Sequence, residues 1–351
     1  TASHPSSAYQ KSDLIKEEKN LLIRQTERMG VSLFKLKGIT GKGVRVAIFD
    51  AGFPGVDVLP AFDHIRKRNG IISTYDFVAK KDFVFANSEH GTEVMSCIGG
   101  MADTINIGLA TGCDFLLART EDSRKEPFSE EVNWLAAAEW ADKNGAQIIN
   151  SSLGYTDARY FPSQMDGKTT LVARAANMAA RKGILVVNAA GNDGSGNWKK
   201  LGTPADADSV LTVGGINPET DFHAEFSSYG PTADFRRKPN VSAFGYVMAA
   251  TPKGLGKAQG TSFASPLVAG FAACVLEMNP GMKNMELFRA VEQSGDLYPY
   301  YDYAHGYGIP QASYFTDNNA SSKTPTFHVN INERQLEIKI APDLLIKNGL
   351  Y

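Results

Sequence analysis

Three side chains that could together cleave an amide bond are spread widely along the sequence. Asp50 follows an apolar run, His90 lies within Glu-His-Gly-Thr, and Ser262 lies within Gly-Thr-Ser-Phe-Ala-Ser-Pro. A serine hydroxyl is a poor nucleophile at neutral pH unless a base takes its proton and a third group orients that base. Asp50, His90 and Ser262 supply these three parts, so their residue types predict nucleophilic catalysis if the fold brings them together.

Each of these residues also has a simpler structural interpretation. A serine before an apolar segment is typical of a capped core helix, with Thr261 or Ser262 as the cap and Pro266 in the first turn. An Asp after a strand is commonly a turn residue. The sequence has six histidines, of which three are interpreted as structural: His64, His223 and His305.

Strand and helix patterns alternate around these residues. Apolar runs typical of buried parallel strands cover residues 44–50, 115–119, 147–150, 184–188 and 210–213, and helical patterns cover 129–145 and 171–182. This alternation predicts an α/β fold, a doubly wound and mostly parallel sheet with helices on both faces. In such sheets functional groups gather at the carboxyl ends of the strands, where Asp50 falls.

The 351 residues suit one large α/β domain with small additions at both ends. We expect an N-terminal extension over 1–40 that contains an amphipathic helix, a main domain over 41–315, a polar linker over 316–323 and a small β segment over 324–351. Within the last segment, apolar residues at 327–331 and 336–340 alternate with polar ones, which predicts a β-hairpin. Such a hairpin would pack on the main domain or begin a larger β module.

Composition argues against several classes of function. The net charge of -2 and the pI near 6.3 give no electrostatic footprint for nucleic acid or an anionic membrane. No apolar run is expected to span a membrane, and the N-terminus lacks the order of a signal peptide. The three cysteines show no metal-ligand spacing, so no zinc site is expected, while one disulfide stays open.

The motifs around Asp50, His90, Asn192 and Ser262, in this order, resemble those of the subtilisin-like serine proteases, the subtilases, over residues 40–315. The resemblance implies a secreted serine endopeptidase, extracellular or periplasmic, that cleaves proteins or peptides through an acyl-enzyme. Ser262 would be the nucleophile, His90 the base and Asp50 its orienting partner, with Asn192 in the oxyanion hole. Ala51 departs from the family, which usually has Ser or Thr there.

The resemblance also implies a substrate pocket walled by Ser152, Leu153, Gly154, Ala190 and Gly191, together with Ala189, and with Gly202 at its base. Since these side chains are uncharged, we expect a preference for apolar or aromatic residues before the scissile bond. Two lysines, Lys199 and Lys200, are expected at a solvated rim. Residues 253–257 are expected to form a mobile approach to the serine.

No cofactor is expected for catalysis. The resemblance leaves structural calcium open, because Asp57 lies in a suitable loop but no ordered series of oxygen ligands is present. An inhibitory propeptide is typical of the family, although the 49 residues before Asp50 predict that a full one is absent here. Two alternatives remain: a pseudo-enzyme or binding module that has lost turnover, and a transpeptidase that transfers the acyl group to an amine.

Overall fold

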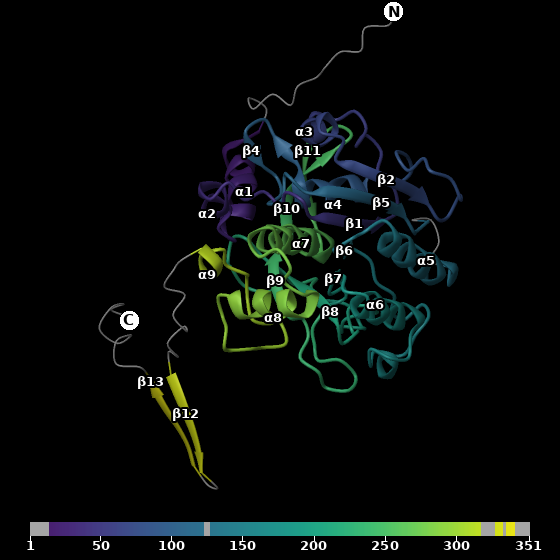
Figure 1. Cartoon of the computed structure of the whole chain (residues 1–351). Helices are drawn as coiled ribbons and strands as arrows, with labels where there is room; N and C mark the ends of the chain where they lie inside the picture. Colours follow the sequence, from purple (N-terminus) through teal and green to yellow (C-terminus); the bar gives the residue numbers. More distant parts are fainter. Residues whose placement is uncertain (1–13, 123–126, 317–326, 333–334, 341–351) are drawn as a thin grey trace, which may run out of the picture.

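A seven-stranded parallel sheet forms the centre of the protein (Figure 1). The computed structural model describes residues 14–122, 127–316, 327–332 and 335–340. The strand order is β2-β5-β1-β6-β7-β8-β9, and each pair of neighbours is parallel. The strands are β1 (Arg45–Asp50), β2 (Ile71–Asp76), β5 (Asp114–Arg119), β6 (Ile148–Ser151), β7 (Leu185–Ala189), β8 (Val210–Ile216) and β9 (Val241–Phe244). The predicted fold class is confirmed.

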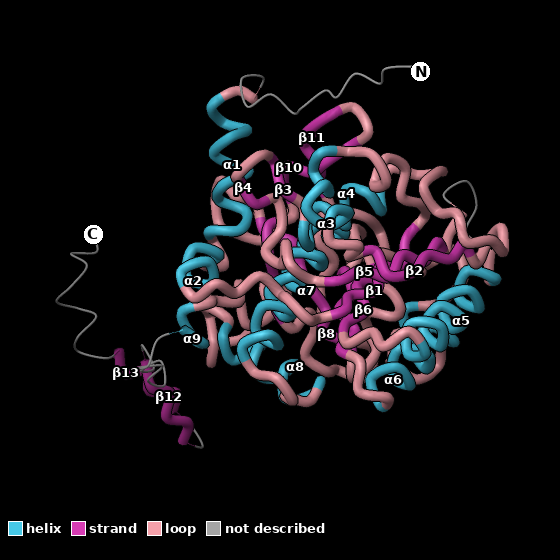
Figure 2. Tube along the Cα trace, turned by 45° about the horizontal axis from the view of Figure 1, so that its top comes forward, coloured by secondary structure: helices cyan, strands magenta, loops and turns pink. Residues whose placement is uncertain are grey.

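Helices cover both faces of this sheet, and each face has its own apolar core (Figures 1 and 2). Side chains alternate along a strand, so Ile48 of β1 joins one core while Ala47 and Phe49 join the other. The first core contains α4 (His90–Gly99), α7 (Thr261–Met278) and α8 (Asn284–Ser294), and the second contains α5 (Ser129–Lys143) and α6 (Leu171–Arg181). The apolar runs of the strands are long because both of their faces are buried.

Helix α7 is almost entirely buried, and its N-terminal part differs from the prediction in two ways. By length and composition it could cross a membrane, but 83% of it is buried inside the protein, which is typical of a core helix. The residue before it is Gly260, at a φ of 139° that L side chains rarely adopt, and neither Thr261 nor Ser262 caps it. Pro266 lies beyond the first turn, inside the helix.

The predicted N-terminal helix is present as α1 (Lys16–Glu27), followed by α2 (Val31–Leu36), while residues 1–13 lie outside the described residues. It is fixed more firmly than a surface helix, because Leu22 and Gln25 are buried. The Gln25 amide donates to the carbonyls of Ile107 (2.8 Å) and Met248 (3.0 Å) and accepts from the Met248 N–H (2.8 Å). A side chain of α1 therefore pairs with the backbone of a strand far along the chain.

The expected approach loop before the serine is instead a strand. Residues 253–257 fall mostly in β11 (Gly254–Gln259), which pairs antiparallel with β10 (Tyr246–Thr251). The glycines at 254 and 256 suggested a loop, but ladder hydrogen bonds hold them in a hairpin that leads into α7. The remaining short elements are β3 (Met101–Ala102), β4 (Ile105–Asn106), α3 (Asp63–Lys67), α9 (Ser313–Thr316) and the 3-10 turns η1 (Pro60–Phe62) and η2 (Pro162–Gln164).

The predicted C-terminal hairpin is confirmed as β12 (Phe327–Asn332) and β13 (Gln335–Ile340), which pair antiparallel. It projects away from the main body in both views (Figures 1 and 2). The Phe327 ring stacks on Tyr300 with centroids 4.6 Å apart. Most of the expected linker, at 317–323, lies outside the described residues, as do 341–351.

None of the three cysteines forms a disulfide. Cys97, Cys113 and Cys274 are all buried and free. Burial raises the pKa of each thiol well above its usual value, since the low-polarity interior disfavours the thiolate. These residues behave as small apolar core residues.

Candidate active site

Asp50 and His90 are in direct hydrogen-bond contact in the predicted site. Asp50 is the last residue of β1 and His90 the first of α4. The Nδ1 atom of His90 lies 2.8 and 3.0 Å from the two carboxylate oxygens of Asp50. Since Nδ1 must carry a proton to bind a carboxylate, Asp50 selects the tautomer that leaves Nε2 free to accept a proton.

Glycine at position 91 is what allows this contact. A Cβ atom there would lie 2.3 Å from the Gly52 carbonyl oxygen and 3.0 Å from the Asp50 Cβ, so α4 could not approach β1 as closely with any other residue. The Asp50 carboxylate also accepts from the Ala51 N–H at 2.7 Å. The backbone of Ala51 thus holds the carboxylate although its side chain lacks the hydroxyl usual in the family.

The charge of Asp50 controls the protonation of His90. Burial alone would lower the pKa of the His90 imidazole, but the charge and hydrogen bond of Asp50 raise it to about 9. Glu121 and Glu93 raise this pKa further by smaller amounts. His90 therefore holds its proton more tightly than a free imidazole.

Ser262 is the second residue of α7 and is almost fully buried. Its Oγ donates to the Ser152 carbonyl at 3.2 Å, and not to His90. The ring of its neighbour Phe263 lies against the His90 ring, with centroids 5.6 Å apart. The structure therefore pairs Asp50 with His90 and holds Ser262 next to a residue that contacts His90.

Pro266 and Ser152 fix the backbone at this serine. A proline has no N–H, so the Ser262 carbonyl four residues earlier loses its helical donor. The Ser152 hydroxyl replaces that donor at 2.9 Å, and itself accepts from the Asn150 amide at 3.0 Å. Ser265 completes the chain by donating to the Asn150 Oδ1 at 2.8 Å.

Replacing Ser152 by Ala is expected to destabilise the fold by about 1–3 kcal/mol, because it leaves the buried Ser262 carbonyl without a partner. Chemical denaturation would measure this loss. In the background of Pro266→Ala the same change should cost less, since that background restores a backbone N–H that can bond to the Ser262 carbonyl. Equal losses in both backgrounds would contradict this role of Ser152.

The amide of Asn192 is oriented by Thr261. Its Oδ1 accepts from the Thr261 N–H at 2.9 Å and from the Thr261 hydroxyl at 3.1 Å. A backbone N–H can only donate, so these bonds identify the oxygen of the amide. The Nδ2 group of Asn192 has no hydrogen-bond partner among the residues the structure describes and is available to a ligand.

The two predicted pocket walls follow neighbouring strands. Residues 152–154 follow β6, and residues 189–191 are the last residue of β7 and the two after it. Because β6 and β7 are parallel neighbours, these two segments lie side by side at the carboxyl ends of the strands. Ser152, Leu153 and Ala190 are buried, Gly191 is half-buried and Gly154 is exposed.

Gly202, the predicted base of the pocket, packs against the backbone that follows Gly154. A two-way backbone pairing of Tyr155 with Thr203 brings these segments together. A Cβ atom at Gly202 would lie 2.8 Å from both the Tyr155 carbonyl oxygen and the Thr156 Cγ2. A valine at this position would therefore displace the Tyr155–Thr156 segment, so its effect would not be confined to the pocket.

Of the charged residues considered for the pocket, Lys200 and Asp206 have other partners. Lys199 is exposed, and the Nζ of Lys200 donates to the Gly230 carbonyl at 2.6 Å. Asp206 is buried and accepts from the Gly167 N–H at 2.7 Å, and burial raises its pKa to about 6. Asp57, considered for calcium, lies exposed in a turn. Within the described residues no three His, Cys, Asp or Glu side chains are grouped to hold a metal ion.

The sequence motifs did not identify Asn150, Thr261 or Ser265 as parts of the site. None of these three takes part in the predicted chemistry. Thr261 orients Asn192, Asn150 donates to Ser152 of the predicted pocket wall, and Ser265 in turn donates to Asn150. The signal in the sequence is weak: Asn150 is a polar residue at the end of a buried strand, and Thr261 has the pattern of a helix cap.

Comparison with known proteins places this site in context. A model of the subtilase family matches residues 41–308. Subtilisin NAT of Bacillus subtilis subsp. natto is 31% identical over 300 residues, which cover 83% of this chain and 70% of the relative. Alkaline elastase YaB of Bacillus sp. (strain YaB) is 30% identical over 282 residues, which cover 78% and 66%.

Solved structures share the fold at lower identity. MycP1 from Mycobacterium smegmatis has a TM-score of 0.65 at 22% identity, covering 88% of both chains. A cold adapted subtilisin-like serine proteinase has a TM-score of 0.59 at 24% identity, covering 78% of this chain and 88% of that one. These similarities support the architecture of the sheet and its helices.

Proposed function

Because the chain belongs to the subtilase family and is a serine endopeptidase, we propose that it hydrolyses peptide bonds through Asp50, His90 and Ser262 with an acyl-enzyme intermediate. The observation that carries this proposal is the bidentate contact of His90 with Asp50, at 2.8 and 3.0 Å. The region that the family model matches includes all four motif residues, so family membership supports the roles proposed for them.

In this mechanism the Ser262 hydroxyl turns from the Ser152 carbonyl to His90 Nε2, which requires a rotation about one side-chain bond. Loose catalytic hydrogen bonds in the unliganded state commonly tighten only when substrate is bound. His90 takes the proton as Oγ attacks the substrate carbonyl, and returns it to the leaving amine. Asp50 stabilises the imidazolium formed between these two steps.

Two donors are proposed to stabilise the oxyanion of the tetrahedral intermediate: the Asn192 Nδ2 group and the Ser262 N–H. The first is supported by the two bonds that Thr261 makes to the other end of the amide. The second is supported by the position of Ser262 in the first turn of α7, where a backbone N–H has no acceptor within the helix. Family catalysis of this type needs no cofactor.

Replacing Asn192 by Ala should lower the rate constant about 10²–10³-fold with little change in KM, a range known for the corresponding loss in subtilisin. The amide would meet full negative charge only in the transition state, so substrate binding should hardly respond. Steady-state kinetics on a chromogenic peptide would measure both constants. A change confined to KM would show that Asn192 only contacts the bound substrate.

We propose a preference for Phe, Tyr, Leu or Met before the scissile bond, supported by the uncharged walls at 152–154 and 189–191. Each buried methylene of the substrate would contribute about 0.8 kcal/mol, whereas a Lys or Arg would lose its hydration without a carboxylate partner. Digestion of a peptide library, read by mass spectrometry, would measure this preference. Cleavage mainly after Arg or Lys would contradict it.

A substitution at Gly154 tests the pocket more selectively than one at Gly202, because it does not displace the neighbouring backbone. A Cβ atom at Gly154 would meet only the Thr203 carbonyl oxygen, at an ordinary 3.6 Å. Gly154→Val should therefore shift the preference toward smaller residues without lowering the melting temperature. Gly202→Val should lower the melting temperature as well, and the pair separates pocket narrowing from backbone displacement.

The same experiments exclude the alternatives. Labelling of Ser262 by a fluorophosphonate would separate an active enzyme from a pseudo-enzyme or binding module, and product masses would separate hydrolysis from transfer to an amine. We further propose an extracellular or periplasmic location and an inhibitory propeptide among its partners. Cell fractionation tests the location.

A further inference from the structure

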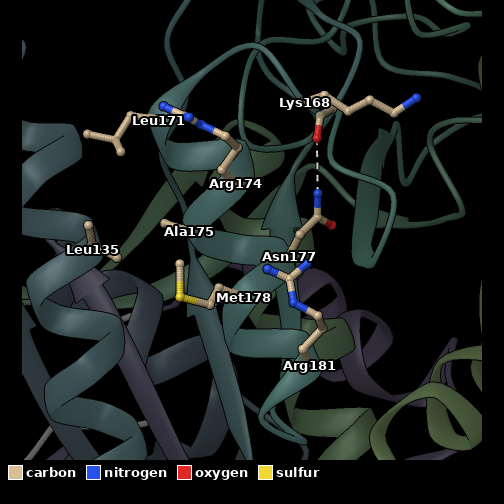
Figure 3. Close-up of a pocket in the computed structure, with 9 residues that line it drawn as sticks. Leu135, Lys168, Leu171, Arg174, Ala175, Asn177, Met178 and Arg181 are labelled. Atoms are coloured by element: carbon tan, nitrogen blue, oxygen red, sulfur yellow. Dashed lines mark hydrogen bonds between the residues drawn. The ribbon is translucent and has the colours of Figure 1, made fainter.

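Two adjoining hollows lie along α6, on the face of the sheet opposite α7, and Figure 3 shows the residues that line the larger one. Their volumes are about 470 and 380 Å³, and they share Gly167, Lys168, Asn177 and Arg181. The catalytic mechanism uses none of these residues. The volume of the larger hollow lies near the lower end of the range found for pockets that bind small molecules or peptide side chains.

The larger hollow combines positive charge with an apolar floor. Lys168, Arg174 and Arg181 are exposed, and none of them has an ion-pair partner within the described part of the chain. Arg174 and Arg181 are seven residues apart, which is about 10 Å along a helix. Figure 3 shows Leu171 and Met178 on the same side of α6. We call this surface the α6 groove, formed by Leu135, Lys168, Leu171, Arg174, Met178 and Arg181.

The loop that carries Lys168 is held in place. Asp166 accepts hydrogen bonds from the Lys168 and Thr169 N–H groups at 2.9 and 2.8 Å. The Asn177 amide donates to the Gly167 carbonyl at 3.0 Å and accepts from the Ser209 N–H at 3.0 Å. Because this surface is already ordered, little conformational entropy is lost when a ligand binds, so weak charge contacts contribute more to the net affinity.

Arg236, the cation that lines only the smaller hollow, is already paired with carboxylates, so among the described residues the unpaired positive charge of the two hollows comes from the groove residues Lys168, Arg174 and Arg181. Arg236 in the smaller hollow is paired with Asp234 at 2.8 Å and lies 3.9 Å from Asp208. The groove thus attracts anions, although the whole chain carries a net charge of -2. Single exposed ion pairs contribute little, so its ligand needs several carboxylates.

One contact connects the groove to the proposed substrate pocket. Thr170, which caps α6, is hydrogen-bonded through its Oγ1 to the Thr203 Oγ1 at 2.5 Å. Thr203 follows Gly202 in the chain. The groove therefore begins beside the segment that is proposed to receive substrate.

We propose that the α6 groove is an exosite for an acidic segment of protein substrates, with carboxylates spaced about 10 Å apart around an apolar side chain. The carboxylates would pair with Arg174 and Arg181, and the apolar side chain would contact Met178 and Leu135. This inference rests on the proposed function, since it extends substrate recognition beyond the pocket. It predicts that acidic proteins are cleaved in preference to neutral ones.

Binding is measured on the Ser262→Ala protein, so that it does not depend on hydrolysis. The probe is a fluorescent peptide in which Glu flanks Leu and Met, and its control has Gln in place of each Glu. By fluorescence anisotropy we expect the Glu peptide to bind and the Gln peptide not to bind, with affinity falling as salt is added. Lys168→Glu, Arg174→Glu and Arg181→Glu together should weaken binding at least about tenfold.

The matched control reverses three exposed lysines near α2, Lys35, Lys37 and Lys42, which changes the net charge by the same amount. It should bind the Glu peptide within about twofold of the parent. Equal losses in both triple variants, or equal binding of the Gln peptide, would overturn the proposal. So would groove-dependent binding of phosphatidylserine vesicles or duplex DNA without binding of the Glu peptide.

A second measurement uses the active enzyme. The ratio of kcat/KM for a substrate with an acidic tail to the same substrate without it should exceed 1 in the parent and fall to about 1 in the groove variant. A ratio that stays unchanged in the groove variant would overturn the exosite. Loss of all activity in the parent would instead contradict the proposed function, while the binding result would still stand.

Discussion

Replacing Ser262 by Ala is expected to lower the rate constant for peptide hydrolysis about 10⁶-fold, the loss that removal of this residue causes in subtilisin. The hydroxyl is the proposed nucleophile, so the remaining rate would come from transition-state contacts and bound water. The fold should be intact, because among the described residues the substitution removes one hydrogen bond of this side chain, the 3.2 Å donation to the Ser152 carbonyl. Single-turnover kinetics together with circular dichroism would measure both quantities.

Fluorophosphonate labelling supplies the control for this experiment. The parent should be labelled and Ser262→Ala should not, while Ser163→Ala, which removes an exposed serine of η2, should be labelled like the parent. If Ser262→Ala kept most of the peptidase activity, the assignment of the nucleophile would be wrong.

Replacing Asp50 by Asn should lower kcat/KM about 10⁴-fold, because an amide can select the wrong tautomer of His90. It should also shift the pH range in which activity is lost on the acidic side of the profile, the acidic limb. His90 acts as a base only when neutral, so with its pKa raised to about 9 activity in the parent should rise as pH rises through that value. Without Asp50 the remaining main influence is burial, which lowers the pKa, so the acidic limb should move below the ordinary value of 6.5.

The profile of kcat/KM from about pH 5 to 11 would measure this shift. Glu93→Gln is the matched control, since Glu93 lies on the same helix as His90 but contributes only a small part of the rise in its pKa. It should move the limb far less than Asp50→Asn does. An acidic limb that stays in place in Asp50→Asn would mean that a group other than His90 controls it.

Much of the sheet could be predicted from the sequence because buried parallel strands are continuous apolar runs, as in β1 and β7. The edge strand β2 was missed because it is only half-buried and carries polar residues, so its run is interrupted. The opposite edge strand, β9 with the sequence VSAF, was also missed, since a serine interrupts its short apolar run. Local pattern therefore identified the centre of the sheet better than its edges.

For the site, the motifs around Asp50, His90, Asn192 and Ser262 stood out, but the contacts that hold these residues did not. Ser152 and Ser262 are 110 residues apart, and Asn192 and Thr261 are 69 apart, so no local pattern reports their hydrogen bonds. The predicted position of Pro266 was also wrong, since a proline beyond the first turn is acceptable only when another donor serves the carbonyl it frees. That donor, Ser152, comes from the segment after a different strand.

The pairing of Gln25 with Met248 has a consequence for how the chain assembles during synthesis. The two residues are 223 positions apart, so the ribosome completes α1 long before its partner strand exists. Until β10 emerges, α1 lacks this part of its packing, although its contact with Ile107 can already form, and contacts of such long range form slowly. Helix α1 therefore completes its docking only after Met248 has been made, and a chain stalled before that point would leave α1 without its contacts to β10.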